Sequence, residues 1–351
     1  MPQQISLLDS LQDGQQSMCG GGNSTDFIHS YDDIISLDNL LSAWTEFLRG
    51  KRSRADVQVF QMNLMDNIFC LHHDLQNKTY VHGGYAAFNI SDPKPRHIHK
   101  ASVRDRLLHH AVYRQLYPQH NQTFIAHSYS CRKNKGTHKA LDAFTAMSRK
   151  VSKNNTKTAW VLKCDIKKFF TSIDHERLHK ILQKKIGDSD TLWLLGQVIT
   201  SFETAPDKGL PLGNLTSQLL VNIYMNEFDQ WMKHTQKVKY YIRYADDFGV
   251  LSQDKQYLLD VLQKLKQFLQ EKLLLQLHPD KVSISTVASG VDFLGWVHFS
   301  HHRILRTVTK RRMLQNIAGL ELDSPTVQSC VGMLQHGDAY KLQRQINTCF
   351  L

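Results

Sequence analysis

The feature that most constrains this chain is the tetrapeptide Tyr244-Ala245-Asp246-Asp247, which places two adjacent carboxylates inside an apolar run over residues 240–251. Aromatic and β-branched residues on both sides predict a β-hairpin with the two acids at its tip. Adjacent carboxylates repel each other and resist burial unless a cation lies between them. Mg²⁺ suits such a site because it binds a few carboxylate oxygens together with substrate phosphates. A solvated Asp-Asp turn is the ordinary alternative, so the metal site depends on a second acidic segment.

That second segment is the apolar run over residues 160–165, which ends in Asp165. It is followed by Ser172-Ile173-Asp174-His175, a sequence that can start a helix. Three carboxylates at the ends of two strands could hold two metal ions. Such a pair activates an attacking 3′-hydroxyl and stabilises the departing pyrophosphate in an in-line phosphoryl transfer.

Asp165 and Tyr244-Ala245-Asp246-Asp247 resemble the two metal-binding motifs in the palm domain of reverse transcriptases. The resemblance extends from about Tyr31 to the C-terminus, and six motifs follow in order. It implies an α+β right-hand polymerase fold, with fingers, a palm built on an antiparallel sheet, a short helical thumb and a helical N-terminal extension. The further motif segments are residues 94–98 and 103–107 (first fingers motif), 128–138 (second fingers motif), 209–218 (the loop and helix behind the templating pair), 277–281 (later palm motif) and 293–296 (primer grip).

Within that superfamily, Leu212 and the run Gly213-Asn214-Leu215-Thr216-Ser217-Gln218 resemble the enzymes of diversity-generating retroelements. Group II intron and retroviral enzymes usually carry Gln at the position of Leu212. The resemblance implies error-prone RNA-directed DNA synthesis, with structured template RNA, its cDNA, deoxynucleoside triphosphates and a small basic accessory protein as partners. A phage-defence or group II intron-like reverse transcriptase remains an alternative. An intron maturase is less expected, because the chain ends soon after the thumb.

The resemblance also assigns roles to individual residues. Two Mg²⁺ ions, for which Mn²⁺ is expected to substitute, would be held by Asp165, Ile166, Asp246 and Asp247. Lys281 would protonate the departing pyrophosphate and completes the catalytic set with the three aspartates. The nucleotide-binding residues would be Arg96, Arg132, Ile166, Phe170, Leu212 and Gly213. The primer and template contacts would be Phe293, Leu294, Gly295, Trp296, Lys310, Arg311 and Arg312.

Several of these roles have a plain structural alternative. Arg96 and Arg132 would hold the triphosphate, because guanidinium groups fit phosphate oxygens. Phe170 would exclude a ribose 2′-hydroxyl, and the alternative is a core phenylalanine, which Phe169 is expected to be. Leu212 offers no hydrogen-bonding group beside the nascent base pair, unlike glutamine. The primer-grip residues could serve packing alone, and Arg104 and Arg106 could simply pair with Asp105 or with Glu residues.

Composition agrees with this interpretation. The 351 residues carry a net charge of +11 with a pI near 9.3, which suits a polyanionic partner or an anionic membrane surface. No apolar run approaches a membrane span and the N-terminus lacks a signal pattern, so a cytoplasmic protein without a membrane partner is expected. Six scattered cysteines make a disulfide framework or structural zinc site unexpected. The expected division is a flexible tail (1–30), helices (31–75), fingers and palm (76–300) and thumb (301–351). A helix over residues 103–117 and a long amphipathic helix over residues 255–275 are also expected.

One rival motif is His175-Glu176-Arg177-Leu178-His179, which satisfies the zinc-peptidase pattern His-Glu-x-x-His. The extended pattern is incomplete, because Leu182 and Lys185 stand where Gly and His would be, although Glu203 could be a more distant ligand. A solvated first helical turn explains the same residues. The remaining rival class is a non-catalytic RNA-binding protein with a polymerase fold, against which the three intact aspartates argue.

Overall fold

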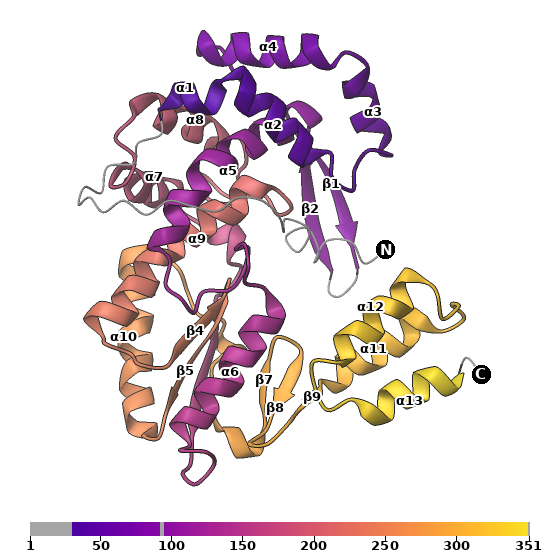
Figure 1. Cartoon of the computed structure of the whole chain (residues 1–351). Coiled ribbons are helices and arrows are strands. Elements are labelled where there is room, and N and C mark those ends of the chain that lie inside the picture. The colour runs from indigo at the N-terminus through magenta and orange to yellow at the C-terminus, as the bar shows by residue number, and fades with distance from the viewer. Residues whose placement is uncertain (1–29, 92–94, 350–351) are drawn as a thin grey trace, which may run out of the picture.

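The computed structural model describes residues 30–91 and 95–349, with side chains described as far as Ile346 (Figure 1). The predicted tail, Ser30 excepted, and Lys94 of the first fingers motif therefore lie outside the described residues. None of the helices in the described ranges is both long enough and apolar enough to cross a membrane.

The chain begins with a cluster of helices, as the helical spacing of apolar residues between Ser36 and Leu75 predicts. A capping box at Ser30 starts the first helix. Leu40 and Ile68 are fully buried, and the Asn39 amide donates to the Ala111 carbonyl (3.2 Å), which ties this cluster to the fingers. The four helices are α1 (Tyr31–Ile35), α2 (Leu37–Phe47), α3 (Ala55–Met62) and α4 (Leu64–Gln76).

The fingers combine one antiparallel hairpin with helices. The helix predicted over residues 103–117 is α5, which runs further, from Val103 to Thr123. Figure 1 shows the hairpin projecting from the helical region beside the helices of the N-terminal cluster. The elements are β1 (Tyr85–Ile90), β2 (Arg96–Ala101), α5 (Val103–Thr123), α6 (Thr137–Val151), α7 (His175–Gln183) and α8 (Ser189–Thr200).

The palm is a four-stranded antiparallel sheet in the order β4-β5-β3-β6. The predicted hairpin over residues 240–251 is confirmed as β4 and β5, and the predicted amphipathic helix over residues 255–275 is confirmed as α10. The elements are β3 (Trp160–Asp165), η1 (Phe170–Ser172), α9 (Leu215–Gln230), the π-helix η2 (Trp231–Thr235), β4 (Tyr241–Tyr244), β5 (Asp247–Ser252), α10 (Lys255–Leu273), η3 (Pro279–Lys281), β6 (Ser283–Thr286) and η4 (Val287–Ser289).

The C-terminal part joins a small three-stranded sheet, β7-β8-β9, to three helices, which lie to one side of the palm in Figure 1. Strand β9 pairs with β8, so residues 303–305 belong to this sheet although the predicted thumb begins at 301. The elements are β7 (Val291–Phe293), β8 (Trp296–His298), β9 (Arg303–Leu305), α11 (Thr307–Ile317), α12 (Pro325–Leu334) and α13 (Tyr340–Cys349).

Two hydrophobic cores meet at the palm sheet. Leu162 and Phe248 belong to the larger core, which the N-terminal helices, α5, α7 to α10 and the palm share. Val161 and Leu251, on the same two strands, belong to the second core with α6, the β7–β9 sheet and the thumb helices. Alternate residues of a strand point to opposite faces, so the sheet separates the two cores and is buried on both sides.

Candidate functional site

The predicted acidic residues meet at one edge of the palm sheet. Strand β3 ends at Asp165, β5 starts at Asp247, and these two residues are direct antiparallel partners. Strands β4 and β5 are joined by the two-residue turn Ala245-Asp246, with Tyr244 opposite Asp247. Ala245 has φ +55°, so positive φ is confined to the first turn residue, as in a type II′ hairpin turn that normally prefers glycine there. This strained turn holds Asp246 beside the end of β3.

Burial and mutual repulsion both act on these carboxylates. Burial raises the pKa of Asp247 to about 7, with Asp246 and Asp165 adding to the rise and Lys163 opposing it. Burial, then the charge of Asp165, also raises the pKa of Asp246. Oδ1 of Asp247 is buried without a hydrogen-bond partner in the described chain. Carboxylates that are buried, close together and under-satisfied are the groups that a divalent cation stabilises.

Lysines occupy part of the space around these acids. Nζ of Lys281 lies 2.9 Å from Oδ1 of Asp165, and Nζ of Lys163 lies 3.5 Å from Oδ2 of Asp247. Lys281 reaches Asp165 because the preceding segment pairs with the end of β3: His278 donates its backbone N–H to the Asp165 carbonyl (2.8 Å). The predicted catalytic lysine is therefore placed at the acidic centre.

Arg243 and Asp229 support the turn, and sequence reasoning missed both. Arg243 is 1% exposed and donates to both carboxylate oxygens of Asp229, from Nε at 2.8 Å and from Nη2 at 2.6 Å. Its Nη1 donates to the carbonyl of Ala245 at 3.1 Å, directly beside the acids. Tyr241 also donates its hydroxyl to Asp229 (2.7 Å). An arginine in the middle of the apolar strand Tyr241-Ile242-Arg243-Tyr244 was the available signal, because a charge in such a strand requires a buried partner.

The predicted nucleotide-pocket residues lie on segments tied to the fingers hairpin. The carbonyl of Leu212 accepts from the backbone N–H of His99 on β2 (3.1 Å), and Asn214 donates its side-chain amide to the His99 carbonyl (3.0 Å). Gly213 has φ +103°, and an added Cβ there would lie 2.9 Å from a methyl of Ile98, so only glycine fits this approach. Leu212 is half-buried and Gly213 is exposed.

Phe169 and Phe170 divide as predicted in burial: Phe169 is a core residue at 4% exposure, whereas Phe170 is half-buried at the edge of the same core. The carbonyl of Phe170 accepts from the N–H of Leu210 (2.8 Å), which ties η1 to the segment leading to Leu212. Ile166 is buried and donates its N–H to the Asp246 carbonyl (3.1 Å), so only its backbone carbonyl could serve as a metal ligand.

The two predicted triphosphate arginines differ. Arg96 begins β2, is exposed, and its charge lowers the pKa of Asp246, which places it within electrostatic reach of the acids. Arg132 is 6% exposed and donates to the side chain and carbonyl of Asn121 and to the carbonyls of Ile125 and Ser128. Its guanidinium is thus used inside the protein, which argues against the predicted phosphate contact.

Arg104 and Arg106 do pair with acids, but the partners are Asp74 and Asp56 instead of the expected Asp105 or Glu residues. The Asp105 carboxylate instead accepts hydrogen bonds from Tyr80, Gly83 and Ser102.

The predicted primer-grip residues form the β7–β8 hairpin. Phe293 and Trp296 are buried, at 1% and 2% exposure, and Phe293 stacks on Phe144 with ring centroids 5.0 Å apart. Between them, Leu294 (φ +51°) and Gly295 (φ +84°) make a two-residue turn with positive φ at both positions. The aromatic pair is therefore structural, whereas the two turn residues are half-buried, with Leu294 packed against the edge of the second core. Lys310 and Arg311 are exposed on α11, and Arg312 is half-buried on the same helix.

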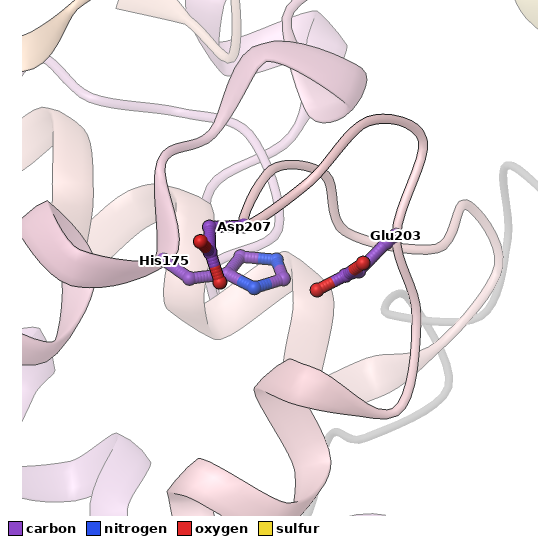
Figure 2. Close-up of side chains that lie close together, drawn as sticks. All are labelled: His175, Glu203 and Asp207. Carbon is purple, nitrogen blue, oxygen red and sulfur yellow. The ribbon is translucent and has the colours of Figure 1, made fainter.

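The zinc-peptidase pattern does not assemble. Within the described ranges, the one group of three His, Cys, Asp or Glu side chains whose ligand atoms all lie within 4.8 Å of one another is His175, Glu203 and Asp207 (Figure 2). His179 is not in that group, and Glu176 pairs with Lys180 on the helix surface. Of the other residues considered for the zinc-peptidase pattern, Glu203 alone belongs to the group that contains His175. The three palm aspartates do not meet this distance criterion.

Comparison with known proteins decides the family. The family model described as "Reverse transcriptase (RNA-dependent DNA polymerase)" matches residues 91–298, more than half of the chain. The chain belongs to the reverse transcriptase family. The matched segment contains Asp165, Asp246 and Asp247, so the acidic edge lies inside the polymerase domain of this reverse transcriptase.

Individual relatives are distant. The chain is 26% identical to Protein YkfC of Escherichia coli K12 over 254 residues, covering 62% of this chain and 65% of that protein. It is 21% identical to the Putative COX1/OXI3 intron 2 protein of Saccharomyces cerevisiae over 278 residues, covering 61% and 30%. The chain thus spans less than two thirds of the length of these relatives. Among solved structures, apo telomerase from Candida tropicalis aligns with 11% identity and a TM-score of 0.46, covering 63% of this chain and 48% of that one.

Proposed function

We propose that this chain is an active RNA-directed DNA polymerase whose catalytic centre is formed by Asp165, Asp246 and Asp247. The observation that carries the proposal is the state of the acidic edge: buried neighbouring carboxylates with raised pKa values, one of which has an unpaired oxygen. Burying neighbouring carboxylates costs folding free energy and does not stabilise the fold. Such an arrangement is expected where the carboxylates bind metal ions. Family membership supplies the reaction class.

The donor set fits Mg²⁺, since it consists of hard carboxylate oxygens with room for the backbone carbonyl of Ile166. Bound there, two Mg²⁺ ions would activate the primer 3′-hydroxyl and neutralise charge on the transferred phosphoryl group. Arg96, exposed on β2 near Asp246, is placed to hold the triphosphate. Lys281 would leave Asp165 and donate a proton to the departing pyrophosphate.

Phe170 and Leu212 are placed to shape the nucleotide pocket. Both are half-buried, and the carbonyl of each accepts a backbone hydrogen bond that ties the 209–213 segment to its neighbours. The ring edge of Phe170 would meet a ribose 2′-hydroxyl and so favour deoxynucleotides. The half-buried Leu294-Gly295 turn and the basic face of α11, with the exposed Lys310 and Arg311, would contact primer and template backbone.

Replacing Asp246 by Asn tests the proposal. This change removes one metal-binding charge and should abolish Mg²⁺-dependent extension of a DNA primer on an RNA template, with Mn²⁺ assayed in parallel. RNA binding should persist, because lysine and arginine side chains make those contacts. Asp260→Asn makes the same chemical change on the exposed face of α10 and should leave extension unaffected. Extension at the wild-type rate by Asp246→Asn would remove the site assignment.

For the biological setting, we propose a diversity-generating retroelement, where an error-prone copy of a template repeat enters a target gene. The support is Leu212, whose side chain cannot hydrogen-bond beside the nascent pair. One hydrogen bond of about 1 kcal/mol changes discrimination about five-fold. Leu212→Gln should therefore lower misincorporation several-fold, above all opposite template adenine, without abolishing synthesis. Equal error spectra from sequenced cDNA of both forms would refute this role. The element's structured RNA and a small basic accessory protein would be the partners.

An intron-like setting is the second candidate, favoured by two relatives from Saccharomyces cerevisiae whose names describe them as COX1/OXI3 intron proteins. Faithful synthesis by the wild-type enzyme would count against the retroelement. A near-identical repeat pair differing at adenines in the neighbouring DNA would decide for it.

A further inference from the structure

A second group of side chains that could bind a metal ion lies beside the segment that leads to Leu212. His175 opens α7, whereas Glu203 and Asp207 lie in the connection between α8 and α9, about 30 residues later. One ligand atom from each lies within 4.8 Å of the other two. Figure 2 shows the imidazole of His175 between the carboxylates of Asp207 and Glu203. None of these residues belongs to the acidic edge of the palm.

The protonation state of His175 follows from its surroundings. Nε2 lies 2.7 Å from the carbonyl oxygen of Gly209, which can only accept, so Nε2 carries a proton and donates it. In the neutral ring, Nδ1 then presents a lone pair. The His175 side chain is buried, at 3% exposure, and Nδ1 has no hydrogen-bond partner within the described residues. A ligating histidine commonly has this arrangement, in which one nitrogen donates to a carbonyl and the other faces the metal.

The two carboxylates are exposed, and neither is ion-paired with a lysine or arginine in the described part of the chain. The imidazole of His175, whose Nδ1 has no hydrogen-bond partner among the described residues, and two negative groups thus surround a common space (Figure 2). Such a set has no mutual attraction unless a cation or a proton enters it. A proton on Nδ1 would be expected to form a hydrogen bond to one of the carboxylates, and the structure has none.

We propose that His175, Glu203 and Asp207 bind a Zn²⁺-type divalent cation, separate from the catalytic ions. One imidazole and two carboxylates suit zinc, whereas Mg²⁺ prefers oxygen ligands alone. Zinc ligands at about 2.0–2.2 Å from the ion lie about 3–3.5 Å apart in a tetrahedron. The exposed side chains of Glu203 and Asp207 would close by about 1 Å to reach that spacing, and water would complete the coordination.

The backbone already holds the loop in place for this role. Gly209 donates its N–H to the Ile173 carbonyl (2.8 Å), and His175 donates its N–H to the Asp207 carbonyl (2.9 Å). Asp207 has φ +57°, a left-handed conformation that aspartate tolerates. A bound ion would cross-link the start of α7 to this loop, whose last ligand, Asp207, lies five residues before Leu212. The site would therefore fix the position of the nucleotide pocket without taking part in the chemistry.

Zinc binding by the whole protein in excess Mg²⁺ tests the proposal, because Mg²⁺ fills the catalytic site. Equilibrium dialysis followed by elemental analysis should give one Zn²⁺ per chain in the wild type and in Asp246→Asn/Asp247→Asn. Glu203→Gln/Asp207→Asn should bind at least ten-fold more weakly. Both substituted side chains are exposed, so this variant should fold, which circular dichroism verifies. Glu176→Gln is the matched control, since it neutralises an exposed acid next to His175 outside the group.

A second measurement tests the proposed effect on the loop. Zn²⁺ should raise the Tm and slow amide hydrogen exchange over residues 203–213 in the wild type and in Glu176→Gln, and do neither in Glu203→Gln/Asp207→Asn. Unchanged zinc binding in the double variant would overturn the proposal. Loss of the tight site in Asp246→Asn/Asp247→Asn would also overturn it, because the zinc would then lie at the palm aspartates. These results do not depend on polymerase activity.

Discussion

Removal of Asp229 should destabilise the palm strongly, because it leaves the guanidinium of Arg243 buried without a counter-charge. Asp229 is fully buried and accepts two hydrogen bonds from Arg243 and one from Tyr241. Breaking a buried ion pair from one side costs about 3–5 kcal/mol. Since domains of this kind are stable by about 5–15 kcal/mol, Asp229→Ala should bring the protein close to unfolding at 37 °C.

Replacement of both partners separates stability from function. Asp229→Leu/Arg243→Met fills the space with apolar atoms and removes the uncompensated charge, so it should recover at least about 2 kcal/mol relative to Asp229→Ala. The double variant still lacks the hydrogen bond from Arg243 to the Ala245 carbonyl. The strained turn that carries Asp246 should therefore be looser, and primer extension should stay low in a protein that folds.

Urea unfolding followed by circular dichroism gives the stabilities, and primer extension on RNA gives the activity. Asp260→Asn serves as the surface control. Two results would refute the reasoning: a loss below about 1 kcal/mol in Asp229→Ala, or a double variant no more stable than that single variant. Full activity in the double variant would show that the turn does not need Arg243.

Two further predictions concern the site itself. Phe170→Ala should raise ribonucleotide incorporation while deoxynucleotide use persists, and unchanged discrimination in single-nucleotide extension would make Phe170 a packing residue only. The raised pKa of Asp247, about 7 against about 3.9 in an unfolded chain, means that the folded state binds more protons between those values. Without divalent cations, its contribution to stability is therefore present at about pH 4 and lost as the pH rises through 7. The difference in unfolding free energy between wild type and Asp247→Asn, measured against pH, should show this slope, and Mg²⁺ should abolish it. A flat difference would mean that Asp247 is not buried as described.

The acidic edge could be predicted from sequence because local patterning carries it. An apolar strand that ends in Asp165 and an apolar hairpin that turns at Ala245-Asp246 each follow from neighbouring residues. The pairing of these two strands is not a local feature of the sequence. The resemblance to polymerases implied it, because both strands carry acidic residues at their ends. The division between buried Phe169 and half-buried Phe170 followed from the same motif.

What sequence could not give depends on distant contacts. Arginine is a residue type that commonly binds phosphate, so sequence alone suggests this role for Arg132. Only the fold shows that its guanidinium donates hydrogen bonds to the carbonyls of Asn121, Ile125 and Ser128. Asp229 lies 14 residues before Arg243, on a helix whose own pattern does not reveal which acid turns inward. The His-Glu-x-x-His pattern pairs His175 with His179. In the structure, the ligand atoms near His175 instead come from Glu203 and Asp207, in a loop about 30 residues away.

The Leu294-Gly295 turn has a consequence for how this protein can change. A leucine at φ +51° costs about 1 kcal/mol or more relative to asparagine or glycine, the residues that such a turn prefers. Asparagine at this position would relieve the backbone strain of the turn, yet it would remove a half-buried apolar side chain from the tip of the predicted primer grip. Selection for stability and selection for primer contact would therefore favour different residues at position 294. A homologue that has lost the need to hold a primer would be free to exchange this leucine for asparagine.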